Sequence, residues 1–222
     1  MGFGLSLGLA LASILLFILF LFTGISAYKK RWNMGYDMRN CFPYEINYRQ
    51  RFTDNILPNA ILTFVVATSL GLFIFFDIKN LSGATIVTLA CGCLGAILVF
   101  FMFFTDIRFI RFHIALFSLL AIAAFGSPAS IAVISYQKYQ SSNNVYYIVI
   151  ALIAVVVGLF AFALIMNPRL SFKLQMQKAV GIDGKETLMR PKYFVLAFSE
   201  WLFIFTYFFS EILLLLVYLP IK

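Results

Sequence analysis

The stretch "FSEWLFIFTYFFSEILLLL", residues 198–216, is apolar almost throughout, as is typical of a helix that crosses a membrane. It nevertheless carries two glutamates, Glu200 and Glu211, each directly after a serine. A charged side chain at the centre of a bilayer costs at least ~2.5–3.5 kcal/mol. The stretch therefore predicts a membrane helix whose acids are protonated, paired with another group or placed beside water.

The whole 222-residue chain has the same apolar character. Hydrophobic residues make up 63% of it and charged residues 12%, and its mean hydropathy is +0.96. A soluble domain keeps roughly a quarter of its residues charged. Six stretches approach or exceed the ~20 residues that a spanning helix needs, without the alternation typical of barrel strands. They are residues 3–27, 56–77, 84–105, 109–135, 146–166 and 193–219. The sequence thus predicts an all-α membrane protein, in which residues 1–222 form a single bundle of six transmembrane helices.

Basic residues predict the orientation of these spans. Residues 1–27 contain no Lys or Arg, so they lack the basic start of a cleavable signal peptide and are predicted to stay as the first span. Six spans place loops 28–55, 106–112 and 167–192 on one side, which we call face A, and both termini on the other, face B. Of the 17 Lys and Arg residues, all but Lys79, Lys138 and Lys222 lie on face A. The positive-inside rule therefore predicts that face A is cytoplasmic and that both termini lie outside the cytoplasm.

Three local patterns give further expectations. The small residues between Cys91 and Ala96 predict close helix contacts in the third span. Gly126-Ser127-Pro128 predicts a kink or break in the fourth span. The loop segment "NCFPYEINYRQRF", residues 40–52, mixes aromatic and basic side chains and is expected to lie in the head-group interface.

Polar residues follow one flank of the last span. Glu200 and Glu211 are eleven residues apart, just over three helical turns, so they face nearly the same way. Two neighbouring stripes continue this flank: Glu200, Tyr207, Glu211 and Tyr218 in one, and Ser199, Thr206 and Ser210 in the other. The pattern predicts a flank that faces the bundle interior or an aqueous cavity.

The nearest candidate partner for Glu200 is His113, the single histidine of the chain. Glu200 lies seven residues, or ~10 Å, inside Tyr193, and Glu211 lies ~16 Å further along the helix. Glu200 is therefore nearer face A, where His113 begins the fourth span. Both residues also have a structural interpretation, His113 as an interfacial packing residue and Glu200 as a hydrogen-bond anchor.

These patterns define the candidate site. The predicted substrate-binding residues are Glu200, His113, Tyr207 and Glu211, and a catalytic role is left open for the first two. One histidine excludes a multi-histidine metal site, and neither a metal nor another cofactor is predicted. The net charge of +8 follows from membrane topology, so nucleic acid is not an expected partner. The expected partners are membrane lipids, other membrane subunits or a second copy of the chain.

Three segments carry a family resemblance: "FSEWLFIFTYFF" at 198–209, "RFHIAL" at 111–116 and "NCFPYEI" at 40–46. They resemble the Glu-Trp signature of the last span, the histidine of the fourth span and the Pro-containing first loop of a six-span family. That family includes the damage-regulated autophagy modulators, the FGF-receptor-activating protein and the Golgi protein that processes GPI anchors. The resemblance implies lipid handling or membrane trafficking, with Glu200-Trp201, His113 and Pro43 as its matched residues.

Two features depart from that family. The resemblance implies cytoplasmic termini, whereas the charges predict the reverse. Segment 106–112 also lacks the longer, less basic loop expected before the histidine.

Three functions remain compatible with the sequence. The first is a lipid-interacting protein with a polar intramembrane pocket that opens on face A. The second is a small proton- or cation-coupled transporter that uses Glu200 and Glu211. The third is a structural or assembly subunit of a membrane complex, whose polar flank contacts a partner. The sequence leaves open whether the protein is an enzyme.

Overall fold

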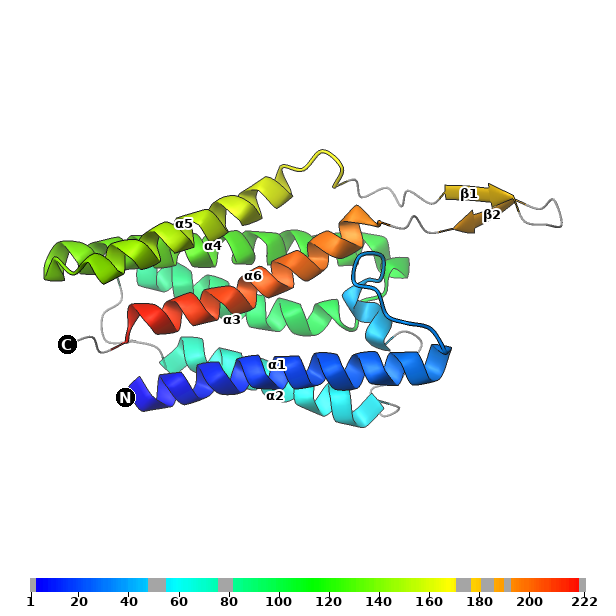
Figure 1. Ribbon diagram of the computed structural model, residues 1–222, viewed down its shortest axis with the longest axis horizontal. Helices are drawn as coiled ribbons and strands as arrows, with labels where there is room; N and C mark the ends of the chain where they lie inside the picture. Colours follow the sequence, from blue (N-terminus) through cyan, green and yellow to red (C-terminus); the bar gives the residue numbers. More distant parts are fainter. Residues whose placement is uncertain are drawn as a thin grey trace.

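Six long helices form the protein (Figure 1). The computed structural model describes residues 3–47, 55–75, 82–170, 177–180, 186–189 and 193–219. The helices are α1 (Phe3–Trp32), α2 (Ile56–Phe75), α3 (Gly83–Met102), α4 (Ile110–Ser142), α5 (Val145–Ile165) and α6 (Val195–Val217). All six are long and apolar enough to cross a membrane. The predicted six-helix membrane bundle is therefore confirmed.

Among the described residues, three short elements with given bounds lie between the helices. Two are 3-10 turns, η1 (Pro43–Asn47) and η3 (Ile107–Phe109). The third is an antiparallel hairpin of β1 (Gln177–Val180) and β2 (Glu186–Met189), which the sequence analysis did not predict. Figure 1 shows both chain termini at one end of the bundle, and η1 and the hairpin at the other. The latter end is face A.

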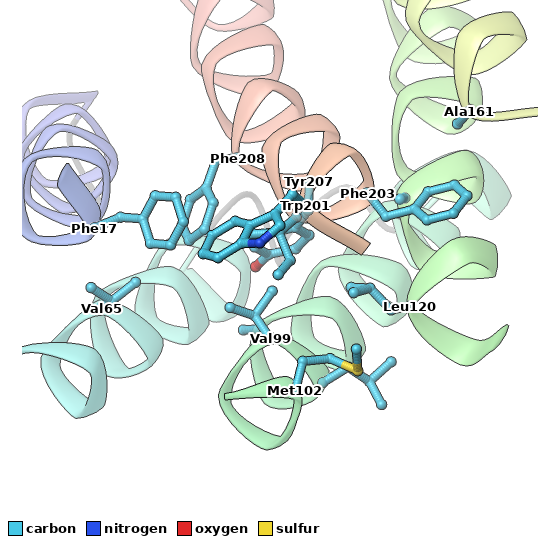
Figure 2. Packing of buried hydrophobic residues seen from close by; sticks show 14 of the residues in the cluster. Phe17, Val65, Val99, Met102, Leu120, Ala161, Trp201, Phe203, Tyr207 and Phe208 are labelled. Atoms are coloured by element: carbon cyan, nitrogen blue, oxygen red, sulfur yellow. The ribbon is translucent and has the colours of Figure 1, made fainter. Parts of the chain in front are cut away.

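Helix α6 lies at the centre of the bundle, where it packs against α1, α3, α4 and α5. Its apolar rings reach several neighbours (Figure 2). Phe208 stacks on Phe17 of α1 with ring centroids 4.0 Å apart, and Phe203 meets Phe117 of α4 at 5.4 Å. The predicted polar flank points inward too: Ser199, Glu200, Thr206, Tyr207, Ser210 and Glu211 are all buried. Its inward orientation is thus confirmed, whereas Tyr218, at the end of the stripe, is only partly buried.

Two glycines of α3 allow this close packing. A Cβ atom at Gly92 would overlap the ring of Phe73 in α2, and one at Gly95 would overlap the ring of Tyr207 in α6. The Tyr207 hydroxyl also donates to the Gly92 carbonyl at 3.0 Å, which holds the ring against α3. The prediction that small residues bring the third span close to its neighbours is confirmed.

Gly95→Ala is therefore expected to destabilise the bundle. Tyr207 is fully buried, so the added methyl group forces a shift in packed atoms, which costs about 1–3 kcal/mol. Gly8→Ala is the matched control, because no atom lies within 4 Å of a Cβ built there. Denaturation in detergent micelles measures both effects. Equal losses of unfolding free energy in the two variants would contradict the contact.

Helix α4 differs from its prediction in continuity. The sequence suggested a kink or break at Gly126-Ser127-Pro128, but α4 runs without interruption from Ile110 to Ser142 with Pro128 inside it. A break is therefore excluded. A proline inside a membrane helix is tolerated where neighbouring helices pack against the segment and its freed backbone groups are satisfied. Helix α4 packs against α3, α5 and α6.

Helix α4 is also longer than the predicted span 109–135. It ends at Asn143, whose left-handed backbone (φ 52°) and N–H bond to the Tyr139 carbonyl terminate the helix. Asn144 then caps α5 by accepting from the Tyr146 N–H at 3.0 Å. The expected ten-residue loop 136–145 is consequently only two residues long, Asn143 and Asn144.

Candidate functional site

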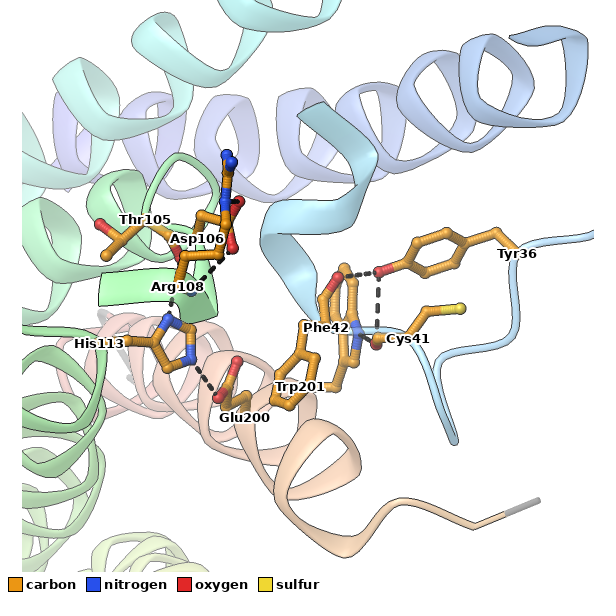
Figure 3. Close-up of polar contacts among 9 residues, drawn as sticks. All are labelled: Tyr36, Cys41, Phe42, Thr105, Asp106, Arg108, His113, Glu200 and Trp201. Carbon is orange, nitrogen blue, oxygen red and sulfur yellow. Dashed lines mark hydrogen bonds and ion pairs between the residues drawn. The ribbon is translucent and has the colours of Figure 1, made fainter. Parts of the chain in front are cut away.

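A buried histidine–glutamate pair joins α4 to α6 near face A (Figure 3). His113 Nε2 lies 2.7 Å from Glu200 Oε1, and His113 Nδ1 lies 2.9 Å from the Thr105 carbonyl oxygen. The two side chains are 1% and 0% exposed, respectively. The structure therefore brings together the two residues that topology placed on the same side.

The contacts determine where the protons of this pair reside. A carbonyl oxygen only accepts hydrogen bonds, so His113 Nδ1 must carry a proton and donate it to Thr105. One further proton lies between His113 Nε2 and Glu200 Oε1. The pair is then either a neutral acid with a neutral imidazole or a carboxylate with an imidazolium, and its net charge is zero in both forms. This neutrality is what allows two titratable groups to be buried inside the bundle.

The first loop folds over the pair. Residues 41–47, including η1, are all buried. The rings of Phe42 and Tyr44 each meet the His113 ring edge-on, with centroids 5.8 Å apart. Residues 41–47 thus pack into the end of the bundle, and the expectation that residues 40–52 lie at the level of the head groups stays a prediction. Residues 48–52 lie outside the described residues.

Two hydrogen bonds to backbone carbonyls fix this loop. The indole N–H of Trp201 donates to the Cys41 carbonyl at 3.0 Å, and the Tyr36 hydroxyl donates to the Phe42 carbonyl at 2.7 Å. Figure 3 shows Glu200 directed at His113 while Trp201, the next residue, is directed at the loop. The Glu-Trp dipeptide thus holds α4 with one side chain and the first loop with the other. Sequence analysis missed the loop contact, because a carbonyl acceptor has no residue signature.

The buried Tyr36 hydroxyl is expected to make the stability of the fold depend on pH under alkaline conditions. Burial is the largest cause that raises the pKa of Tyr36 well above its usual value, and the neighbouring Cys41 and Glu45 side chains raise it further. The unfolded tyrosine ionises near pH ~10, whereas the folded one keeps its proton. The unfolded state therefore binds fewer protons above that pH, and stability falls as the pH rises further.

We expect the stability advantage of the wild type over Tyr36→Phe to be full below pH ~10 and to shrink above it. Detergent denaturation between pH 8 and 11.5 measures this difference. Tyr36→Phe keeps every other titratable group, so the difference in stability between the two proteins reports the ionisation of Tyr36 alone. A difference that stays constant over the range would contradict an ionisable, buried Tyr36.

A cavity of about 550 Å³ lies beside the folded loop on face A. It is lined by the aromatic residues Tyr28, Trp32 and Tyr44, the acidic residues Asp37, Glu45 and Asp106, the base Arg108, and Met34, Gly35, Asn40 and Cys41. Hydrogen bonds from Arg39 lower the pKa of Asp37, so this carboxylate is ionised. The size falls within the ~300–1,000 Å³ of ordinary ligand sites.

None of the four predicted substrate-binding residues lines this cavity. His113 and Glu200 lie behind its wall: Tyr44 touches the cavity and also packs on His113. Asp106, one residue after the carbonyl that holds His113, lines the cavity as well. The His113–Glu200 pair therefore contacts the cavity lining indirectly, through Tyr44 and the Thr105–Asp106 segment.

Glu211 belongs to a second, separate cluster. Ser13 of α1 donates to Glu211 Oε2 at 2.7 Å and lies 2.8 Å from the Ser69 hydroxyl of α2. Ser69 and Tyr207 also interact with the Glu211 carboxyl group, so side chains of α1, α2 and α6 meet at this acid. The described hydrogen bonds do not connect this cluster to Glu200, since Thr206 and Ser210 donate back to carbonyls of their own helix. Tyr207, the fourth candidate, is bonded to α3 as described above.

The six spans define the class of this protein: it is a multi-pass integral membrane protein, with a cavity lined by aromatic and charged side chains at one end of its helical bundle. In comparisons with known proteins, no family model, no curated protein and no solved structure matches the chain.

Proposed function

We propose that this protein binds a membrane lipid, whose polar head group occupies the cavity on face A. The observation that carries the proposal is the cavity itself, which combines aromatic and charged side chains at the end of a spanning helix. Trp32 and Tyr28 lie in the last turns of α1, beside the basic run Lys29-Lys30-Arg31. Aromatic and basic side chains mark the level of lipid head groups. The family resemblance of the three sequence segments also implies lipid handling.

In this proposal the buried pair has a positioning role. His113 holds the carbonyl of Thr105 beside the cavity-lining Asp106, and its ring packs against the cavity-lining Tyr44. Trp201 holds Cys41, which is also in the lining. Glu200 and Trp201 thereby hold the cavity-lining residues in position, the former through His113 and the latter through Cys41, without contacting the lipid.

Gly35 offers a direct test of the lipid site. Gly35 lines the cavity, and no atom lies within 4 Å of a Cβ built on it. We expect Gly35→Trp to fill the cavity without displacing the bundle, and Gly35→Ala to leave it open. The lipid retained by each purified protein is counted by native mass spectrometry. Wild type and Gly35→Ala are expected to retain a lipid that Gly35→Trp has lost, and equal retention in all three would exclude the cavity as the site.

The transporter alternative has less support. A relay between Glu200 and Glu211 needs polar groups that link them, and the described hydrogen bonds separate the two clusters. The alternative of an assembly subunit draws on no comparable feature of the described residues, because the polar flank is already buried within the chain.

A further inference from the structure

We propose that the cavity recognises the ammonium group of a zwitterionic phospholipid, of the phosphocholine or phosphoethanolamine type. This inference rests on the proposed lipid site and names its ligand class. It differs from the expectation given by face A as a whole, whose basic residues suit anionic head groups.

The aromatic part of the lining provides the first argument. Tyr28 and Trp32 are four residues apart in α1, so they project from the same face of the helix, and their ring centroids are 6.5 Å apart. Tyr44 of η1 supplies a third ring. Aromatic ring faces attract cations, and sites with several such rings are the usual means of binding quaternary ammonium groups.

The charges of the lining provide the second argument. The lining carboxyl groups are those of Asp37, Glu45 and Asp106. Arg39 pairs with Asp37 at 2.8 Å and Arg108 pairs with Asp106 at 2.6 Å, so Glu45 supplies the acidic group beyond these two ion pairs. The Glu45 side chain is 6% exposed, so its carboxylate forms part of the inner wall. The inner surface of the cavity therefore favours a cation on an otherwise basic face.

The position of Arg108 explains why a zwitterion fits better than a simple cation. Its side chain is 67% exposed and bonded to Asp106 at 2.6 Å, which places a positive group at the outer part of the cavity. A head group with its ammonium on the rings and its phosphate toward Arg108 satisfies both charges. An anionic head group such as phosphoglycerol has no cation for the acidic wall.

The test measures head-group preference in nanodiscs that contain equal parts of phosphatidylcholine, phosphatidylethanolamine and phosphatidylglycerol. Lipids that remain on the extracted protein are identified by native mass spectrometry. We expect the wild type to enrich the two ammonium lipids about twofold to thirtyfold over phosphatidylglycerol, the range given by ring–cation contacts. Trp32→Leu and Glu45→Gln are expected to reduce this preference, and each checks the other if one variant folds poorly.

The outcomes separate this inference from the proposed function. If Gly35→Trp displaces a lipid that is phosphatidylglycerol, or one bound without preference, the lipid site stands and ammonium recognition is overturned. If Gly35→Trp displaces no lipid, the lipid site itself fails. A further arm adds soluble phosphocholine. Binding of this compound in preference to the phospholipid would retain the ammonium site but overturn a lipid as its source.

Discussion

Glu200→Ala is expected to lower the free energy of unfolding by about 2–5 kcal/mol, because it leaves the buried His113 Nε2 without its partner, at about 1–3 kcal/mol, and also leaves a cavity. The loss is large because His113 Nε2 is buried and has Glu200 as its hydrogen-bond partner. The substitution also releases α6 from α4 beside the first loop. Denaturation of the purified protein in detergent micelles measures the effect.

Glu200→Gln is the matched control, and it also tests which form the pair takes. Low-dielectric surroundings favour the neutral acid and imidazole over separated charges. A glutamine amide can donate to the neutral Nε2 in place of the acid, so we expect a loss of only about 0.5–1.5 kcal/mol. A loss as large as that of Glu200→Ala would contradict the neutral form and favour the ion pair.

Trp201→Ala is the second substitution with a large expected effect. Trp201 is fully buried, its ring meets Phe103 with centroids 5.6 Å apart, and its N–H holds Cys41. Truncating a buried tryptophan costs about 3–5 kcal/mol, because the cavity left behind is not refilled. The same change frees the loop that covers His113, so faster hydrogen exchange is expected in residues 41–47.

Trp201→Phe separates the two contributions. The phenyl ring retains most of the packing, but it has no N–H for the Cys41 carbonyl. We expect an intermediate loss of stability, while exchange in residues 41–47 accelerates as it does in Trp201→Ala. Unchanged exchange in Trp201→Phe would mean that packing alone holds the loop, contrary to the role assigned to the indole hydrogen bond.

The fold was largely predictable because the bilayer imposes a simple rule on the sequence. Runs of about 20 apolar residues identify the spans, and a period of 3.6 residues orients the polar flank of α6. Topology alone placed His113 and Glu200 on the same side, and the structure pairs them. Helix ends were harder to predict, as α4 shows, since its end depends on the conformation of Asn143.

The cavity and its cover were not predictable from composition. Residues 41–47 contain polar and aromatic side chains, which suggested a surface segment, yet their burial depends on contacts with distant residues. Ile46 lies against Gly24 of α1, and the Arg39 carbonyl accepts from the N–H of Phe194 at the start of α6. Such contacts join positions far apart in the chain, so no local sequence pattern predicts them.

An experimental structure of the protein in a phosphatidylcholine nanodisc tests the central claim most directly. We expect head-group density in the cavity between Tyr28, Tyr44 and Glu45, continuous with acyl chains that lead into the bilayer. We also expect His113 and Glu200 to stay in contact behind the cavity wall. A cavity without lipid density, in a map that resolves ordered lipids elsewhere around the bundle, would contradict the account.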